Sequence, residues 1–271
     1  MSPPRRRLVG GLDLGGTKIQ AVVLDGRRSV IGEARSATPT TGGAQDVILG
    51  LVSTMGSACA DADVELADLA GVGVGSPGAI DTRRGVVTGA GNLPGEGAPI
   101  PVSAGFKTLA ATRAYVDNDV TVGVYAEYVL GAARRSKSLL GVWWGTGVGG
   151  GIVLNGERWD GRGAAAELGH VVVKIDGAEC TCGRRGCMEA YAGRGSMEIR
   201  ARRLHKRGRK TDLFKIMEKR GRTRLTSGVW ARALEAEDVL ATELIERALG
   251  ALGGAIGAAL LVPPGSPGRK R

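Results

Sequence analysis

Residues 8–25 read L-V-G-G-L-D-L-G-G-T-K-I-Q-A-V-V-L-D, and the architecture of the chain can be worked out from this opening. Two apolar runs, Leu8–Leu14 and Lys18–Asp25, predict strands, and the G-G-T between them predicts a tight turn. A third strand is expected near Ser29–Ala34. The chain therefore begins with three successive strands, the first two joined by a glycine turn.

The same opening recurs in the second half of the chain. Leu139–Trp144 predicts a strand, G-T-G-V-G-G-G over residues 145–151 interrupts it, and Ile152–Leu154 continues the pair. Two such α/β units indicate a duplicated architecture, and a cleft between two lobes is where ligands bind. The other expected elements are helices at Ala44–Ala60, Phe106–Thr112, Val120–Ala132, Met188–Lys206 and Val229–Leu261, and strands at Leu69–Gly75, Ala114–Val116 and Val171–Ile175.

The composition of the 271-residue chain is that of a globular protein with many turns. Hydrophobic residues make up 43%, and the 46 glycines stand at the junctions of apolar runs, which predicts tight turns and close backbone approaches. No run is long and apolar enough for a membrane span, and M-S-P-P-R-R-R at the N-terminus precedes no signal-peptide core. We therefore expect a cytoplasmic protein with reduced thiols and no membrane partner.

The formal net charge of +10 is concentrated in one segment. Residues 200–224 hold twelve lysines or arginines against two acids, Asp212 and Glu218. A nucleic-acid surface is one interpretation, but the segment has no aromatic residue for stacking beyond Phe214 and no DNA-binding motif. We interpret it as a solvated, partly helical connector and expect no nucleic-acid partner.

The motif D-L-G-G-T-K has the composition of a phosphate-binding loop. Gly15 and Gly16 let backbone N–H groups approach phosphate oxygens, because glycine has no Cβ. Thr17 adds a hydroxyl, Lys18 adds a cation, and Asp13 can orient hydrated Mg²⁺. The motif matches neither of the common nucleotide-binding glycine patterns, and a plain glycine hairpin is the alternative.

The second glycine loop, residues 145–151, has the same character. Two such loops facing each other would hold the phosphates of a nucleotide from both sides, which favours phosphate binding for the pair. Its candidate phosphate contacts are Gly145, Thr146, Gly147 and Gly149.

Two polar motifs are candidates for the reacting groups. D-N-D at 117–119 follows a predicted strand and precedes a predicted helix, where a carboxylate can take a proton from an attacking hydroxyl. Helix capping is the alternative for Asp119, because Asp and Asn are favoured N-caps. In G-N-L-P-G at 91–95, Asn92 offers a donor and an acceptor for a sugar hydroxyl, or it forms an ordinary Asx turn.

Three of the four cysteines and one of the two histidines lie in E-L-G-H at 167–170 and C-T-C-G-R-R-G-C-M-E at 180–189. A disulfide or scattered core thiols are the alternatives to a metal site. With four protein ligands a zinc ion would be structural, because no position remains open for water. The set that Zn²⁺ takes in a tetrahedron is present as His170, Cys180, Cys182 and Cys187.

Together and in this order, these motifs resemble the ROK family of sugar kinases and sugar-responsive repressors, most closely its bacterial glucokinases. The resemblance covers the chain from about Leu8 to about Val262. The repressor branch carries a DNA-binding helix-turn-helix before the first glycine motif, and with twelve residues ahead of Asp13 we do not expect it here. The matching segments are D-L-G-G-T-K (13–18), G-V-G-S-P-G (73–78), G-N-L-P-G (91–95), D-N-D (117–119), G-T-G-V-G-G-G (145–151), E-L-G-H (167–170) and C-T-C-G-R-R-G-C-M-E (180–189).

The resemblance implies an α/β, two-lobed actin-like and ribonuclease-H-like ATPase fold with ATP and Mg²⁺ in the interlobe cleft. It implies ATP-dependent phosphorylation of a hexose at the 6-hydroxyl, with glucose as the expected substrate, and a homo-oligomer. Phosphoryl transfer needs mainly positioning and charge stabilisation, which two glycine loops, Mg²⁺ and one carboxylate can supply. Asp119 would be the base, and the sugar would be held by Asn92, Asn118, Asp119, Glu167, His170 and Glu189. The structural zinc of the family would be held by His170, Cys180, Cys182 and Cys187.

The expected lobes are residues 1–119, with the first phosphate loop, the sugar loops and the catalytic Asp, and residues 120–262, with the second phosphate loop, the zinc loop and helices. In the family, a further strand, an adenosine-binding glycine motif and closing helices follow the helix that corresponds to Val229–Leu261. Here P-P-G-S-P-G-R-K-R at 263–271 has the composition of a disordered tail. The sequence thus predicts a truncated second lobe with impaired ATP binding, stability and turnover. The alternative functions are a non-catalytic sugar-binding or regulatory protein, a polyphosphate-dependent kinase, and a kinase for another hexose or a hexosamine.

Overall fold

The computed structural model describes residues 7–90, 93–95, 97–161, 165 and 167–260, with the backbone alone for 254–260. It divides into two compact units, Met1–Ala126 and Glu127–Arg271. The division falls inside helix α3 (Asp119–Val129), whereas the sequence placed the boundary where that helix begins. Asn92 and the tail at 263–271 lie outside the described residues. Among the described helices, none is long and apolar enough to cross a membrane.

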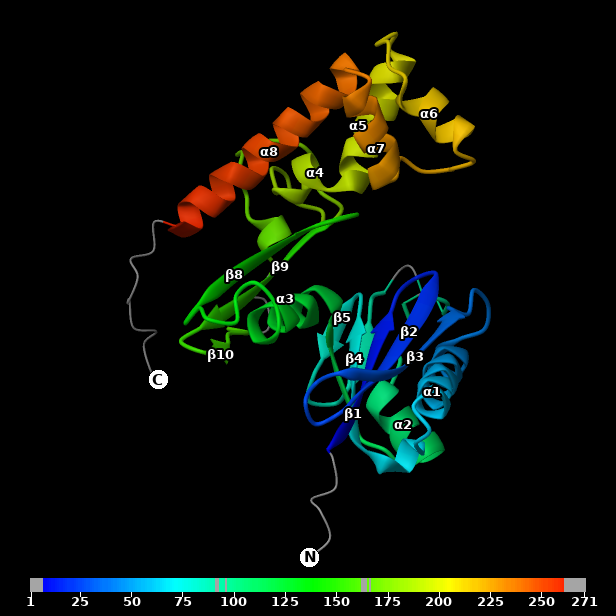
Figure 1. Ribbon diagram of the computed structural model, residues 1–271. Coiled ribbons are helices and arrows are strands. Elements are labelled where there is room, and N and C mark those ends of the chain that lie inside the picture. The colour runs from blue at the N-terminus through cyan, green and yellow to red at the C-terminus, as the bar shows by residue number, and fades with distance from the viewer. Residues whose placement is uncertain (1–6, 91–92, 96, 162–164, 166, 261–271) are drawn as a thin grey trace, which may run out of the picture. The chain divides into compact units, whose positions relative to one another are not determined.

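The first unit is built on a five-stranded sheet in the order β3-β2-β1-β4-β7 (Figure 1). The first three strands form the antiparallel meander that the sequence predicted, and β4 and β7 then pair in parallel with β1 and β4. Antiparallel strands need only a short turn, whereas the parallel pairing requires a longer crossover that contains helix α1 (Ala44–Asp61). The strands are β1 (Leu8–Leu14), β2 (Lys18–Leu24), β3 (Val30–Ala37), β4 (Leu69–Ser76) and β7 (Ala114–Asn118).

The core of the first unit lies between this sheet and its helices. Helix α1 packs against β1, β2 and β3, and helix α2 (Val102–Ala110) packs against β7. In β2 the alternate residues Ile19, Ala21 and Val23 are buried, as expected for a strand with one face on the core. At Gly32 in β3 a Cβ would overlap the Ala58 carbonyl oxygen, so glycine allows α1 to lie close to the sheet.

Two details of the first unit differ from the sequence prediction. A hairpin of β5 (Ala79–Asp81) and β6 (Val86–Thr88) was not predicted, because three residues per strand carry too little alternation. Helix α2 begins at Val102, earlier than the predicted Phe106, and it ends where Ala111 adopts a left-handed conformation with φ of 50°.

The second unit begins with a three-stranded antiparallel sheet in the order β10-β9-β8. As predicted, β8 (Leu139–Trp144) and β9 (Val148–Leu154) pair around the second glycine loop, and β10 (Glu157–Arg158) adds to β9. Glycines place the E-L-G-H motif, which forms the short 3-10 helix η2 (Leu168–His170), against this sheet. A Cβ on Gly150 would overlap the Leu168 side chain, and one on Gly169 would overlap the Val148 carbonyl oxygen.

The helices of the second unit surround a second core, and two of the predicted helices are broken. The helix expected at 188–206 breaks at Gly193, whose φ and ψ are −56° and 127°. The helix expected at 229–261 breaks at Glu237, whose φ is 53°. The buried core includes Leu225, Trp230 and Leu244. In the described part of this unit the helices are α4 (Glu189–Ala192), α5 (Arg194–Lys206), α6 (Leu213–Lys219), α7 (Ser227–Glu235) and α8 (Val239–Leu260).

The prediction of a strand at Val171–Ile175 is wrong. The segment makes one isolated bridge, from Val172 to Cys187, and Ile175 is 84% exposed. Its backbone instead supports the cysteine loop, since the Val173 N–H donates to the Gly186 carbonyl at 2.9 Å. Three adjacent valines indicate strand propensity, but propensity does not distinguish a ladder from a single bridge.

The basic segment 200–224 is more than a connector. It forms most of α5 and all of α6, and Leu213 and Met217 enter the second core. Several of its arginines form ion pairs with acids, so part of the local positive charge is neutralised within the unit. The pairs join Arg202 and Arg224 to Glu198, and Arg209 to Glu243.

Candidate functional site

The carboxyl ends of β1, β4 and β7 bring the acidic motifs of the first unit together. In the sheet register Asp13 lies opposite Gly75, and Gly75 lies opposite Asp117. A Cβ on Gly75 would lie 3.5 Å from the Asp119 Cα, so the D-N-D segment passes directly beside this strand end. Groups at the carboxyl ends of parallel strands are well placed to meet a ligand.

The electrostatics of this strand edge fit a divalent cation. The pKa of the Asp13 carboxyl is raised, first by desolvation and then by repulsion from the Asp119 carboxylate, while Lys18 acts in the opposite direction. A cation at Asp13 would relieve this repulsion. Carboxylate oxygens are the hard ligands that Mg²⁺ takes, so the donor set fits this ion.

Asn118, not Asp119, caps helix α3. The Asn118 Oδ1 accepts hydrogen bonds from the N–H groups of Val120 at 3.0 Å and Thr121 at 3.2 Å. Its side-chain NH₂ is therefore the group that it can offer to a ligand. Asp119 is the first residue of the helix, and its Oδ1 accepts from the Val120 N–H at 2.8 Å.

The first glycine loop is a tight turn that uses part of its own backbone. The Gly15 N–H donates to the Lys18 carbonyl at 3.0 Å, and the Gly15 carbonyl accepts from the Thr38 hydroxyl at 2.6 Å. Gly15 therefore belongs to the framework of the turn. Gly16 and the exposed Thr17 form its tip, which is the part that a phosphate could approach.

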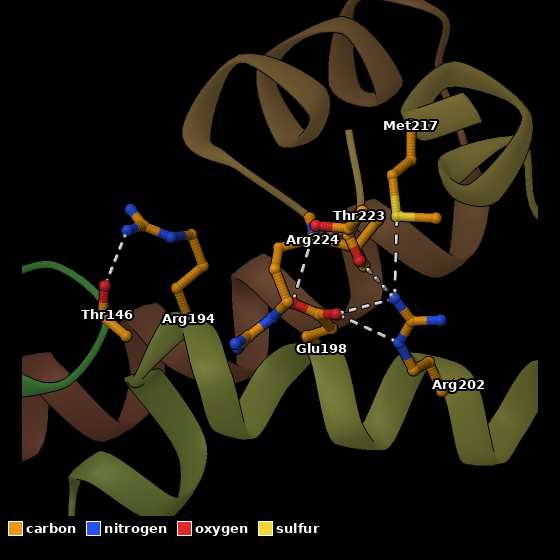
Figure 2. Close-up of polar contacts among 8 residues, drawn as sticks. Thr146, Arg194, Glu198, Arg202, Met217, Thr223 and Arg224 are labelled. Atoms are coloured by element: carbon orange, nitrogen blue, oxygen red, sulfur yellow. Dashed lines mark hydrogen bonds and ion pairs between the residues drawn. The ribbon is translucent and has the colours of Figure 1, made fainter. Parts of the chain in front are cut away.

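The second glycine loop is fixed by the start of α5. The Gly195 N–H donates to the Thr146 carbonyl at 3.0 Å, and Figure 2 shows Arg194 reaching the Thr146 hydroxyl, with Nη2 at 2.9 Å. Arg194 could not be predicted from the sequence, because it lies 48 residues from its partner and belongs to no motif. Gly149, a predicted phosphate contact, lies within β9 opposite Trp143 and outside the turn.

One turn further along α5, the buried Glu198 ties the helix to the segment at 223–225 (Figure 2). Its carboxylate accepts hydrogen bonds from Arg202 at 2.8 Å, from Arg224 at 2.9 Å and from the Leu225 N–H at 3.1 Å. Burial raises the pKa of Glu198, but the hydrogen bonds outweigh it, and the pKa lies below its ordinary value of 4.5. The ionised Glu198 thus stabilises the helix that carries Arg194.

Glu189 links the second glycine loop to the cysteine loop. Its Oε2 accepts from the Val148 N–H at 2.9 Å, and its Oε1 accepts from the Thr181 hydroxyl at 3.2 Å. A Cβ on Gly147 would overlap Oε2, so the loop backbone passes directly over the carboxylate. Both oxygens of this predicted sugar contact are therefore engaged inside the unit.

The four predicted zinc ligands come together in the structure, and their ligand atoms all lie within 4.8 Å of one another. The Sγ atoms of Cys182 and Cys187 are 3.7 Å apart, and the Cys180 Sγ lies 3.6 Å from the His170 Nδ1. A tetrahedral zinc with Zn–S of about 2.3 Å and Zn–N of about 2.0–2.1 Å has edges of about 3.8 Å between sulfurs and about 3.6 Å between sulfur and nitrogen. The spacing fits zinc, and these cysteines are free thiols, so the disulfide alternative is wrong.

Charged neighbours complete the cluster. Hydrogen bonds from the backbone and side chain of Arg184 lower the pKa of the Cys182 thiol to about 6, whereas burial raises that of Cys187 to about 11. A bound cation would favour the thiolate of both residues. His170 presents Nδ1 to the cysteines, and its Nε2 lies 3.9 Å from the Glu167 carboxylate. A carboxylate beside the outer nitrogen is a common feature of histidines that bind zinc.

The structure groups the predicted site residues within each unit. Asp13, Asn118 and Asp119 gather at the strand ends of the first unit, from which the first glycine loop extends. In the second unit Glu167, His170 and Glu189 surround the cysteine loop, and Glu189 connects it to the second glycine loop.

Residues 9–262 match the ROK family. Among curated proteins, a glucokinase of Thermotoga maritima is 32% identical over 214 residues, which cover 79% of this chain and 65% of the relative. An N-acetyl-D-glucosamine kinase of Pectobacterium carotovorum is 33% identical over 198 residues, which cover 68% of this chain and 62% of the relative. The chain thus spans less than two thirds of the length of these relatives.

Solved structures share the fold. A ROK hexokinase from Thermus thermophilus aligns with a TM-score of 0.77 and 32% identity, over 95% of this chain and 79% of that one. A ROK glucokinase from Streptomyces griseus, solved with glucose and AMPPNP, aligns with a TM-score of 0.72 and 27% identity, over 93% of this chain and 78% of that one. The α/β actin-like, ribonuclease-H-like fold expected from the sequence is confirmed.

Proposed function

The chain belongs to the ROK family, and from this premise we propose that it phosphorylates a hexose at the 6-hydroxyl with ATP, with glucose as the preferred acceptor. The observation that carries the proposal is the meeting of Asp13 and Asp119 at the carboxyl edge of the first sheet, beside a glycine turn. Family membership supports the same reaction, because the matched relatives are named as sugar kinases.

Asp119 is the proposed base. The 6-hydroxyl oxygen attacks the γ-phosphorus of ATP, the bond from this phosphorus to the β-phosphate oxygen breaks, and ADP leaves. The hydroxyl proton passes to the Asp119 carboxylate. The Asn118 cap fixes the start of α3, which holds this carboxylate at the strand end.

Phosphate binding is assigned to the tips of the two glycine loops, with the hydroxyls of Thr17 and Thr146 as donors and Lys18 as a cation. Arg194 is a positioning residue, because it donates to the Thr146 hydroxyl at 2.9 Å and so fixes the second tip. Mg²⁺, when held by Asp13, supplies charge neutralisation to the phosphates.

The sugar ring is assigned to the cysteine loop and to Asn118. Glu167 offers acceptor oxygens and His170 a ring nitrogen for sugar hydroxyls, and Asn118 offers its side-chain NH₂. Glu189 offers the remaining lone pair of each oxygen, since each already accepts one hydrogen bond within the unit. A zinc ion in the cysteine cluster would order this loop and would remain outside the reaction, because four protein ligands leave no open position.

An acceptor and donor screen tests the proposal. ADP release and product formation are measured with glucose, mannose, fructose and N-acetylglucosamine, each with ATP and Mg²⁺ and then with polyphosphate in place of ATP. We expect the highest kcat/KM with glucose and ATP. Turnover with polyphosphate but not with ATP would identify polyphosphate as the phosphoryl donor. Glucose binding without turnover would indicate a non-catalytic sugar-binding protein.

A further inference from the structure

A cavity of about 650 Å³ lies within the second unit, lined by the segment at 174–181 and by α5 and α8. It contains none of the predicted phosphate or sugar contacts. Of the described residues that line it, five are cationic and two are acidic. The cationic residues are Lys174, Arg185, Arg200, Arg203 and Arg247.

Arg200 is half-buried, as is Arg247, whereas the other three cations are exposed. The Nε atom of Arg200 is fully buried and, among the residues that the structure describes, it has no hydrogen-bond partner. A buried donor without a partner is costly, so an acceptor supplied by a ligand would be favourable here. The pKa of Arg200 is lowered, first by desolvation and then by repulsion from Arg247 and Arg203, so the three guanidinium groups share one electrostatic environment.

Two of the nearby acids are paired with other arginines than Arg200, Arg203 and Arg247. Glu179 pairs at 2.8 Å with Arg185, which also lines the cavity, and so does not neutralise Arg200, Arg203 or Arg247. Glu243 acts electrostatically on Arg200 from α8, but its carboxylate pairs with Arg209 at 2.7 Å. Asp176 is the other acid of the lining. The excess positive charge of Arg200 and its two neighbours is therefore not matched by these carboxylates.

Arg247 is held in place by an aromatic ring. Its guanidinium carbon lies 4.6 Å from the centroid of the Tyr191 ring, and the Tyr191 hydroxyl accepts from the Ala178 N–H at 2.8 Å. The planar guanidinium is thus preorganised, which reduces the entropy lost when it binds a ligand. Tyr191 and the exposed Ile199 add apolar surface beside the three arginines.

We propose that this cavity binds a small phosphomonoester or inorganic phosphate, with the phosphoryl group held by Arg200, Arg203 and Arg247. Guanidinium forks match phosphate oxygens in pairs, and a dianion balances this cluster better than a single carboxylate. The volume is in the range of small-molecule sites and exceeds what a phosphate alone would fill. The site lies outside the proposed catalytic groups, and its occupancy does not depend on kinase activity.

Calorimetric titration of the full chain at low salt tests this site, with inorganic phosphate, glucose 6-phosphate and glucose as ligands and no nucleotide present. We expect inorganic phosphate and glucose 6-phosphate to share one saturable site per chain, in addition to the hexose binding that glucose alone shows. Equal affinities would assign the site to free phosphate, and tighter binding of glucose 6-phosphate would assign it to the phosphomonoester. Either result supports the proposal.

Variants separate this cavity from the glycine loops. Arg200→Gln and Arg247→Gln should each weaken phosphate binding by about tenfold or more, because each removes a charge-assisted contact. Arg200→Lys keeps the charge but loses the paired donors, so it should give an intermediate loss. Arg222→Gln, on an exposed turn of the same unit, is the matched control and should change the affinity less than about twofold.

The proposal is overturned by any one of three results. One is the absence of saturable binding up to about 10 mM of either phosphorylated ligand, which corresponds to a very weak site. Another is binding that survives unchanged in Arg200→Gln and Arg247→Gln while their tryptophan fluorescence shows a folded second unit. The third is an equal loss in Arg222→Gln, which would assign the binding to net charge and not to the cavity.

Discussion

Replacing the buried Glu198 with Gln should destabilise the second unit by about 2 kcal/mol. The carboxylate accepts charge-assisted hydrogen bonds from two arginines, each worth about 1.5–3 kcal/mol. Arg202 and Arg224 are 41% and 64% exposed, so water recovers part of the loss. Gln keeps one carbonyl oxygen for the buried Leu225 N–H, whereas Ala would remove this acceptor and should cost about 3–5 kcal/mol.

Tryptophan fluorescence during urea unfolding measures this loss in the correct unit. All tryptophans of the chain lie in the second unit, so their emission does not report on the first. Glu218→Gln, at an exposed position of α6, makes the same chemical change and should shift the free energy of unfolding by less than about 0.5 kcal/mol. A loss for Glu198→Gln as small as that of this control would refute the structural role given to the carboxylate.

Wild type and Glu198→Gln also test the sign of the electrostatic effect of this carboxylate on stability. The pKa of Glu198 in the folded chain lies below its ordinary value of 4.5. The stability that the ionised group contributes is therefore complete above pH 4.5 and is lost as the pH falls through the folded pKa. The stability difference between wild type and Glu198→Gln should shrink as the pH falls below this value, and a constant difference would contradict the argument.

Three further substitutions test the cysteine loop and the second glycine loop. Cys182→Ser should lower the zinc that is retained after gel filtration from about one ion per chain to well below that, and equal zinc content in both proteins would argue against the cluster. Gly169→Ala places a methyl group against the Val148 carbonyl oxygen and should destabilise the second unit by about 1–3 kcal/mol; an unchanged melting temperature would be inconsistent with this close approach. Arg194→Gln releases the Thr146 hydroxyl and should raise the KM for ATP more than the KM for the hexose, whereas equal changes in both would indicate a general structural defect.

The strand pairs around the two glycine loops could be predicted because their signals are local. Apolar runs flank a glycine turn in β1–β2 and again in β8–β9, and neither pairing depends on distant residues. The helix break at Glu237 could not be predicted in this way. It is stabilised by Asp238, which is buried and accepts a hydrogen bond from the Thr211 hydroxyl, 27 residues away in sequence.

The candidate site shows the same division. The candidate zinc ligands could be named from their spacing, because three of the four cysteines of the chain lie within eight residues. Arg194 and Glu198 could not, because each acts on a partner far along the chain and arginine and glutamate are common on helix surfaces. The roles of Asp119 and the sugar contacts came from the family resemblance, and their geometry alone would fit several ligands.

The most direct test of the central claim is transfer of the γ-phosphoryl group from ATP to glucose by wild type and by Asp119→Asn. Asn has nearly the same shape but cannot accept the proton, so kcat should fall by about 10²–10⁴-fold while glucose still binds. Asp63→Asn is the matched control, because this exposed residue has a φ of 53° that Asn tolerates, and it should keep the wild-type kcat. Wild-type turnover by Asp119→Asn would contradict the assignment of this carboxylate as the base.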